Sequence, residues 1–68
     1  MFRFLLRLPD GEPPDPAPGF VTAAPEWNVG DTFLLPGGEG FRILAIQTEI
    51  AQQLLDAGFN AVFVVEPL

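Results

Sequence analysis

The side chains in this sequence that could do chemistry are carboxylates, and three of them share one proline-rich stretch. Asp10, Glu12 and Asp15 could gather around a hard cation such as calcium, which takes about six to eight oxygen ligands. Their spacing fits no EF-hand loop, because Pro13 and Pro14 stand where ligand and turn residues are needed. We therefore expect solvated acids here, with no metal site and no cofactor.

Other catalytic side chains are missing from the sequence. It contains no Ser, His, Cys, Lys or Tyr. Nucleophilic catalysis normally uses Ser, Cys, Lys or Thr beside a base, and acid–base catalysis near neutral pH most often uses His. Paired carboxylates could still hydrolyse a substrate, as in glycosidases, but a chain of 68 residues has little volume for the cleft they need. We therefore expect a protein that is not an enzyme.

Charge limits the partners. Nine acids and three arginines give a net charge of −6. Nucleic-acid binding draws most of its affinity from Lys and Arg on phosphates, and anionic membranes also attract basic segments. We expect neither partner. The acidity favours a basic protein partner, so an acidic inhibitor or nucleic-acid mimic that occupies a basic site is an alternative function.

Trp27, the sole tryptophan, is a candidate contact residue. It lies between Pro25 and Gly30, and exposed aromatic rings form the groove in barrels that bind proline-rich peptides. Phe20 is the nearest preceding aromatic residue and belongs to the same candidate surface. The structural alternative is that Trp27 packs over one end of the barrel and fixes the entry to the next strand.

Two further surfaces are candidates for association. Residues 9–19 hold five prolines, and Pro13 and Pro16 have the spacing of a polyproline ligand. The same prolines would also stiffen an ordinary surface loop. In the last apolar run, Val62 and Val64 share a face that one short helix cannot easily cover, which favours a homodimer or a protein partner.

The elements that must position these residues are mainly strands. Residues 1–8 alternate Phe2, Phe4, Leu6 and Leu8 with Arg3, Leu5 and Arg7, the period of a half-buried strand. Arg3 and Arg7 are expected to pair with Glu66 or with loop acids. The other expected strands are a weak edge strand at 20–25, a strand at 32–35, a central strand at 41–47 and a final strand at 61–67.

Turns and one helix complete the pattern. Gly30 suits a left-handed turn, and the residues 36–40 read as a hairpin connection. The stretch 48–58 has a helical period: Thr48 is the expected N-cap, a helix is expected over about 49–57, and Gly58 suits the position after its end. The fold class is thus mainly β, in a single domain of residues 1–68.

The order of these elements is that of an SH3-like five-stranded barrel with a helix before the last strand. The pattern W-x-V-G-D-T-F, then G-x-x-F-R-I-L and V-F-V-V-E-P, resembles short uncharacterised bacterial proteins of this barrel type over residues 26–68. The resemblance implies a barrel and no particular activity. A small α+β sandwich, with the helix as a crossover between parallel strands, is the alternative. The N-terminal stretch lacks the long apolar run of a signal peptide, so a cytoplasmic, non-catalytic interaction protein is expected.

Overall fold

The structure is a computed structural model that describes residues 1–14 and 18–68. In these residues it has five strands and one short helix. In chain order they are β1 (Phe2–Arg7), β2 (Gly19–Thr22), β3 (Thr32–Leu34), β4 (Gly40–Gln47), α1 (Gln52–Asp56) and β5 (Ala61–Pro67). The mainly β fold class, with a helix before the last strand, is therefore confirmed.

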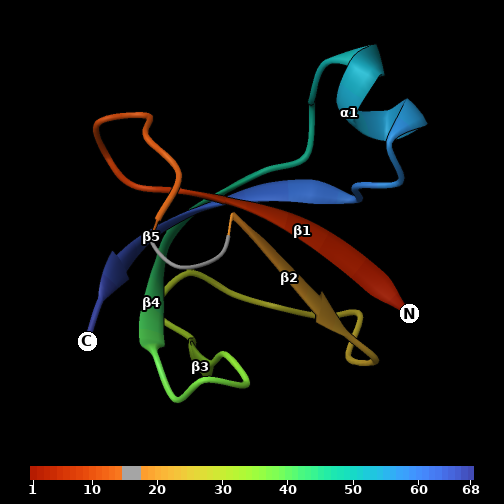
Figure 1. Cartoon of the computed structure of the whole chain (residues 1–68). Helices are drawn as coiled ribbons and strands as arrows, with labels where there is room; N and C mark the ends of the chain where they lie inside the picture. Colours follow the sequence, from red (N-terminus) through yellow and green to blue (C-terminus); the bar gives the residue numbers. More distant parts are fainter. Residues whose placement is uncertain (15–17) are drawn as a thin grey trace.

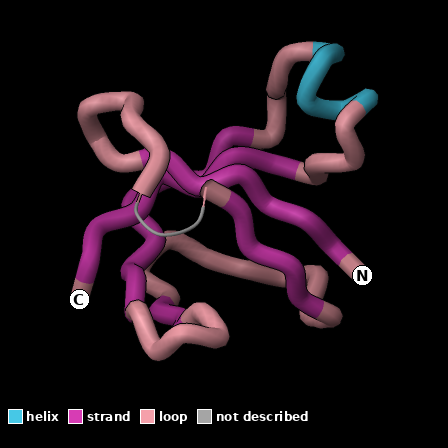
Figure 2. The backbone as a smooth tube through the Cα atoms, viewed as in Figure 1, coloured by secondary structure: helices cyan, strands magenta, loops and turns pink. Residues whose placement is uncertain are grey.

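All five strands belong to one sheet with the order β2-β1-β5-β4-β3. The sheet curls into a half-barrel, an arrangement compatible with a small SH3-like barrel (Figure 1). β5 lies in the middle, parallel to β1 and antiparallel to β4, while β2 and β3 are the two edges. The tube in Figure 2 shows the helix set apart from the strands.

A break in the register of β4 decides which residues face the core. Ile43 pairs with Val65 and Ala45 with Val64, so Leu44 is an extra residue in β4. Such a bulge bends the strand and shifts the alternation by one position. Ile46 consequently lies opposite Phe63 and packs against the core beside Ile43. A regular strand would place Ala45 there instead.

The core fills the concave side of the curled sheet. Phe63, Leu6, Ile43 and Val65 are its most deeply buried large side chains. Phe4 stacks on Phe63, with 4.2 Å between ring centroids. Burial of each such side chain contributes about 1.5–3 kcal/mol, so this cluster is the main source of stability in a chain without cysteine.

The convex side of the sheet is also partly covered. Leu5 and Val62 face away from the core cluster, yet they are only 7% and 6% exposed. Leu5 is paired with both Val62 and Gly19, so the three form one row across the sheet. The ring of Phe59 lies over this row, 3.8 Å from where a Cβ of Gly19 would stand. Phe59, which follows the helix, thus covers part of the face that the sequence suggested would remain open.

The helix α1 is shorter than predicted at its N-terminal end. It begins at Gln52 after Ala51, whose extended backbone makes no side-chain cap, so Thr48 is not its N-cap. The helix buries none of its residues, and no packing on the sheet extends its first turn. Its end was predicted correctly. Gly58 has a φ of +93°.

The C-terminal hydrogen bonds of α1 form a Schellman motif. The Phe59 N–H donates to the carbonyl of Leu54 over 3.0 Å, and the Gly58 N–H donates to that of Leu55 over 2.9 Å. The helix connects β4 to β5, which are antiparallel. The alternative of a crossover helix between parallel strands was therefore wrong.

Two glycine turns place the connections around β3. Gly30 has a φ of +95°, as predicted, in a turn where the Asp31 N–H donates to the carbonyl of Asn28. Gly38 also has a φ of +95°, and its N–H donates to the carbonyl of Leu35, which closes the predicted hairpin turn. The first turn brings the preceding loop, with Trp27, across the open end of the sheet.

Candidate functional site

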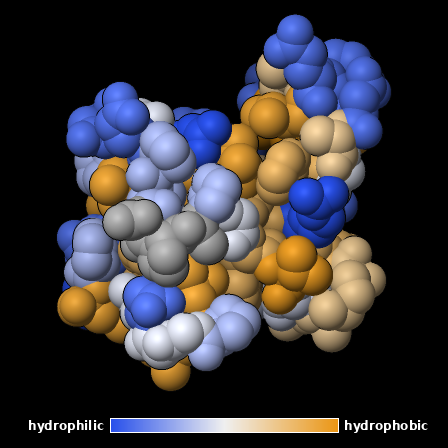
Figure 3. Space-filling model, viewed as in Figure 1, coloured by the Kyte–Doolittle hydropathy of each residue, from blue (hydrophilic) through white to orange (hydrophobic). Residues whose placement is uncertain are grey.

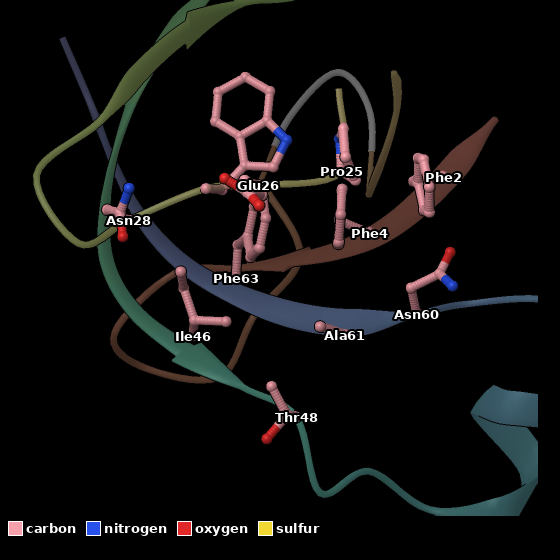
Figure 4. A pocket seen from close by; sticks show the side chains of 11 residues that line it. Phe2, Phe4, Pro25, Glu26, Asn28, Ile46, Thr48, Asn60, Ala61 and Phe63 are labelled. Carbon is pink, nitrogen blue, oxygen red and sulfur yellow. The ribbon is translucent and has the colours of Figure 1, made fainter. Parts of the chain in front are cut away.

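A hollow of the described structure lies between the sheet and the loop that carries Trp27. It has a volume of about 470 Å³. Figure 4 shows its lining, with side chains of β1, β4 and β5 on one side and of the loop 25–28 on the other. The lining residues are Phe2, Phe4, Pro25, Glu26, Trp27, Asn28, Ile46, Thr48, Asn60, Ala61 and Phe63. We call this hollow the Trp27 groove.

Trp27 holds the loop over the core. Its ring centroid lies 5.9 Å from that of Phe33 and 6.3 Å from that of Phe63. Its indole N–H donates a hydrogen bond of 3.0 Å to the carbonyl of Ala24. The side chain is nevertheless only half-buried. Trp27 therefore packs over the end of the sheet, as the structural alternative expected, and it also lines an open hollow; its role as a contact residue stays a prediction.

Phe20 extends this aromatic cluster toward the edge strand β2. Its ring meets Trp27 edge to face, with 5.4 Å between centroids, and stacks on Phe33 at 4.2 Å. Since β2 and β3 are opposite edges of the sheet, the stack of Phe20 on Phe33 joins the two edges through side chains. Two of the predicted contact residues, Trp27 and Phe20, are thus in contact with each other.

The groove has an apolar floor and a polar rim. Phe4, Ala61 and Phe63 form the floor and are buried. The rim carries the polar side chains of Glu26, Asn28, Thr48 and Asn60. Apolar walls with a few polar groups at the margin are typical of binding sites.

The rim side chains differ in whether they already form hydrogen bonds or ion pairs within the chain. Asn60 accepts a hydrogen bond of 2.9 Å from the Arg3 N–H through Oδ1. Among the described residues, the carboxylate of Glu26 has neither an ion pair nor a hydrogen bond. Glu26 is exposed. It therefore retains its full capacity to accept hydrogen bonds or to face a cation.

The structure separates the other predicted contact residues from this groove. Val62 is buried on the convex side of the sheet, so the prediction of an uncovered Val62 was wrong, and Val64 beside it is half-buried. Pro13 is exposed in the loop between β1 and β2, while its neighbour Pro14 is buried. Pro16 lies outside the described residues.

A second, more apolar hollow lies between the two edge strands. Its volume is about 420 Å³, and it is lined by Gly19, Phe20, Val21, Leu34, Leu35 and Pro36. Val21 and Leu34 are 54% and 67% exposed. In Figure 3, hydrophobic side chains gather over β1 and β2, whereas the helix is covered by hydrophilic ones.

The three arginines are all engaged within the chain. Arg42 forms an ion pair of 3.0 Å with Glu66, the one ion pair among the described residues. Arg3 donates to the carbonyl of Ala57, and Arg7 donates to that of Leu6. The prediction that Arg3 or Arg7 pairs with Glu66 was wrong, because Arg42 lies directly opposite Glu66 in the register of β4 and β5.

The acids do not form a metal site in the described part of the chain. No group of three or more carboxylates there is placed to hold an ion. Asp10 accepts a hydrogen bond from the Glu12 N–H, which is a local loop contact. Asp15, the third acid of the candidate calcium cluster, lies outside the described residues.

Sequence reasoning missed several residues of the groove. Phe2 was predicted to share the apolar face of the first strand, but nothing local indicated that Ile46, Thr48 and Asn60 would join it. Ile46 reaches the groove through the bulge at Leu44, and Asn60 through the parallel pairing of β1 with β5. The sequence did contain one indication of the bulge: the apolar residues of β4 fit no single alternating pattern.

Comparison of the chain with protein-family models, with curated proteins and with solved structures gives no match. No helix among the residues described here has the length and apolarity needed to cross a membrane. The site must therefore be interpreted from its own geometry.

Proposed function

We propose that this chain is a non-catalytic interaction domain that binds a protein partner through the Trp27 groove. The observation that carries the proposal is a half-buried tryptophan lining an open hollow of about 470 Å³. Aromatic anchors in partly closed, apolar pockets dominate the energy of protein interfaces, and tryptophan is the most enriched of them. The polar rim around the groove supplies hydrogen-bonding groups that would set orientation.

The packing of Trp27 supports a preformed site. Its contacts with Phe33 and Phe63 and its hydrogen bond to Ala24 hold the indole in place before any partner arrives. Preorganisation of this kind lowers the entropy that binding must overcome. Val62 and Val64, the candidate residues of β5, offer less accessible side-chain surface to a partner, since Val62 is buried and Val64 half-buried.

Site-specific photo-cross-linking tests the proposal. A benzophenone amino acid replaces Asn28, an exposed residue on the rim, in cells of the organism that makes the protein. The control carries the same group at Gln53, which is exposed on α1. We expect a discrete adduct from position 28 and none from position 53. Absence of an adduct at position 28, or equal adducts at both positions, would refute binding through the groove.

Self-association is a second form of the same proposal, and the edge strands favour it. Neither β2, with the sequence Gly-Phe-Val-Thr, nor β3, with Thr-Phe-Leu, contains a charged residue. Two copies of a chain with a net charge of −6 approach each other most easily along such uncharged edges. Sedimentation equilibrium of the protein and of Leu34→Lys is the test. A dimer that the substitution weakens supports this form, and a monomer at all concentrations rejects it.

The acidic mimic is the competing function. Its support is that Glu66 alone, among the acids of residues 1–14 and 18–68, is in an ion pair. Binding of a mimic would weaken steeply as salt screens the charges. Binding through the Trp27 groove would weaken less steeply with salt and would fall when Trp27 is replaced, whereas a mimic that works by its net charge would keep most of its affinity in Trp27→Ala. The effect of Trp27→Ala on the affinity for the cross-linked partner therefore separates the two functions.

A further inference from the structure

The rim of the Trp27 groove carries an acid, Glu26, that forms no ion pair and no side-chain hydrogen bond with residues 1–14 or 18–68. Glu26 follows Pro25 in the loop that crosses the groove, and Figure 4 shows both side chains on the loop side. All three arginines are engaged elsewhere: Arg3 with Ala57 and Phe59, Arg7 with Leu6, and Arg42 with Glu66. The chain thus offers Glu26 to a cation from outside.

The walls of the groove suit the same kind of ligand. Phe2 and Trp27 are half-buried and line the hollow beside Glu26. An aromatic ring attracts a cation to its face, with a free energy of about 0.5–2 kcal/mol that grows as the site excludes water. The apolar floor can also cover the methylene stem of a long basic side chain, whose charged end stays at the rim. Asn28 and Thr48 supply further oxygen atoms there.

We propose that the Trp27 groove binds the side chain of a lysine or arginine from a basic segment of the partner, with Glu26 as its counter-ion. This inference rests on the proposed function, because it names the chemistry of the group that the partner inserts. The net charge of −6 draws a basic segment toward the chain. The carboxylate of Glu26, beside the rings of Phe2 and Trp27, then determines where one cationic side chain of that segment binds.

Small probes test the chemistry without knowledge of the partner. The ¹⁵N-labelled protein is titrated with n-butylammonium, which reproduces a lysine side chain, and with n-butanol, its neutral counterpart. The indole N–H signal of Trp27 reports binding in the groove, since the chain has one tryptophan. We expect n-butylammonium to bind at least about fivefold more tightly than n-butanol. Equal affinities would overturn the proposal.

Matched variants separate Glu26 from the general acidity of the chain. Glu26→Gln should bring the affinities for the two probes to within about twofold of each other, while Asn28→Asp should strengthen the binding of n-butylammonium. Glu12→Gln removes one exposed charge from the loop after β1 and should leave both affinities unchanged. An equal loss in Glu26→Gln and Glu12→Gln would contradict the proposal, because it would show a diffuse field rather than a counter-ion.

The two proposals fail in different ways. A partner cross-linked from position 28, without any preference for n-butylammonium, would remove the cation site and keep the interaction domain. A preference for n-butylammonium without a cross-linked partner would keep the cation site and remove the protein partner. Mapping the cross-linked peptide adds a direct check, since its sequence should contain Lys or Arg beside the linked residue.

Discussion

The guanidinium of Arg3 donates a hydrogen bond of 2.8 Å to the carbonyl oxygen of Ala57 at the end of helix α1. The same guanidinium lies 4.7 Å from the centroid of the Phe59 ring. A side chain in the first strand thus satisfies a free carbonyl at the end of the helix, where a cation is electrostatically favoured. This contact ties Phe59 and the end of the helix to the first strand.

The loss of this contact should destabilise the protein. Arg3→Met keeps most of the apolar stem, removes the hydrogen bond to Ala57 and ends the cation–π contact, so we expect a loss of about 1–2 kcal/mol. Urea denaturation followed by Trp27 fluorescence measures it. Arg42→Met is the matched control, because it breaks an exposed ion pair worth about 0–1 kcal/mol. An equal or larger effect of Arg42→Met would contradict this account of Arg3.

Gly58 should not tolerate a side chain. Its φ of +93° is unfavourable for other residues, and a Cβ there would stand 3.1 Å from Nη1 of Arg3. Gly58→Ala should therefore cost about 1–2 kcal/mol of folding free energy. Gly19→Ala is the control, because its φ is not positive and its Cβ would meet neighbours only at ordinary contact distances of 3.7 and 3.8 Å. Thermal melts of the two variants should differ by several degrees. Similar melting temperatures would refute the conformational argument.

Phe63 should be the most sensitive core position. It is 1% exposed and contacts the rings of Phe4, Trp27 and Phe33. Phe63→Ala should cost about 3–5 kcal/mol, comparable to the whole stability of a domain this small, and should leave little folded protein at 25 °C. Val21→Ala, on the exposed edge strand, should change stability by less than about 0.5 kcal/mol. Circular dichroism of the two purified variants checks both expectations, and a well-folded Phe63→Ala would contradict the assignment of the core.

Salt should stabilise the folded chain. Its net charge is −6, and the one ion pair between described residues is exposed on both sides. Screening therefore relieves more repulsion than attraction. We expect the melting temperature to rise by a few degrees from about 10 mM to about 0.3 M sodium chloride. A fall over this range would indicate attractive charge networks that the structure does not contain among its described residues.

Local features of the fold could be predicted from the sequence because they depend on neighbouring residues. The positive φ of Gly30, the hairpin turn after Leu35 and the end of the helix at Gly58 all follow from the special backbone freedom of glycine. The alternation in the first strand likewise gave Phe4 and Leu6 as core residues.

The predictions that failed concern features that depend on contacts between distant segments. The parallel pairing of β1 with β5 buries Leu5 and Val62, and no local pattern indicates it. Thr48 was expected to start the helix, but the chain remains irregular until Gln52 and Thr48 lines the groove instead. Trp27 was identified as a candidate contact by its type, while its neighbours in the groove come from four separate segments.

Fluorescence of Trp27 is the first measurement to make on the Trp27 groove, since one tryptophan and no tyrosine give the emission a single source. In the structure, the indole packs on the core and also lines an open groove. Acrylamide should therefore quench the folded protein measurably, yet several-fold less than the protein in urea, and n-butylammonium should reduce the quenching further. Complete protection from acrylamide, or quenching as strong as in urea, would contradict the existence of the Trp27 groove as a binding site.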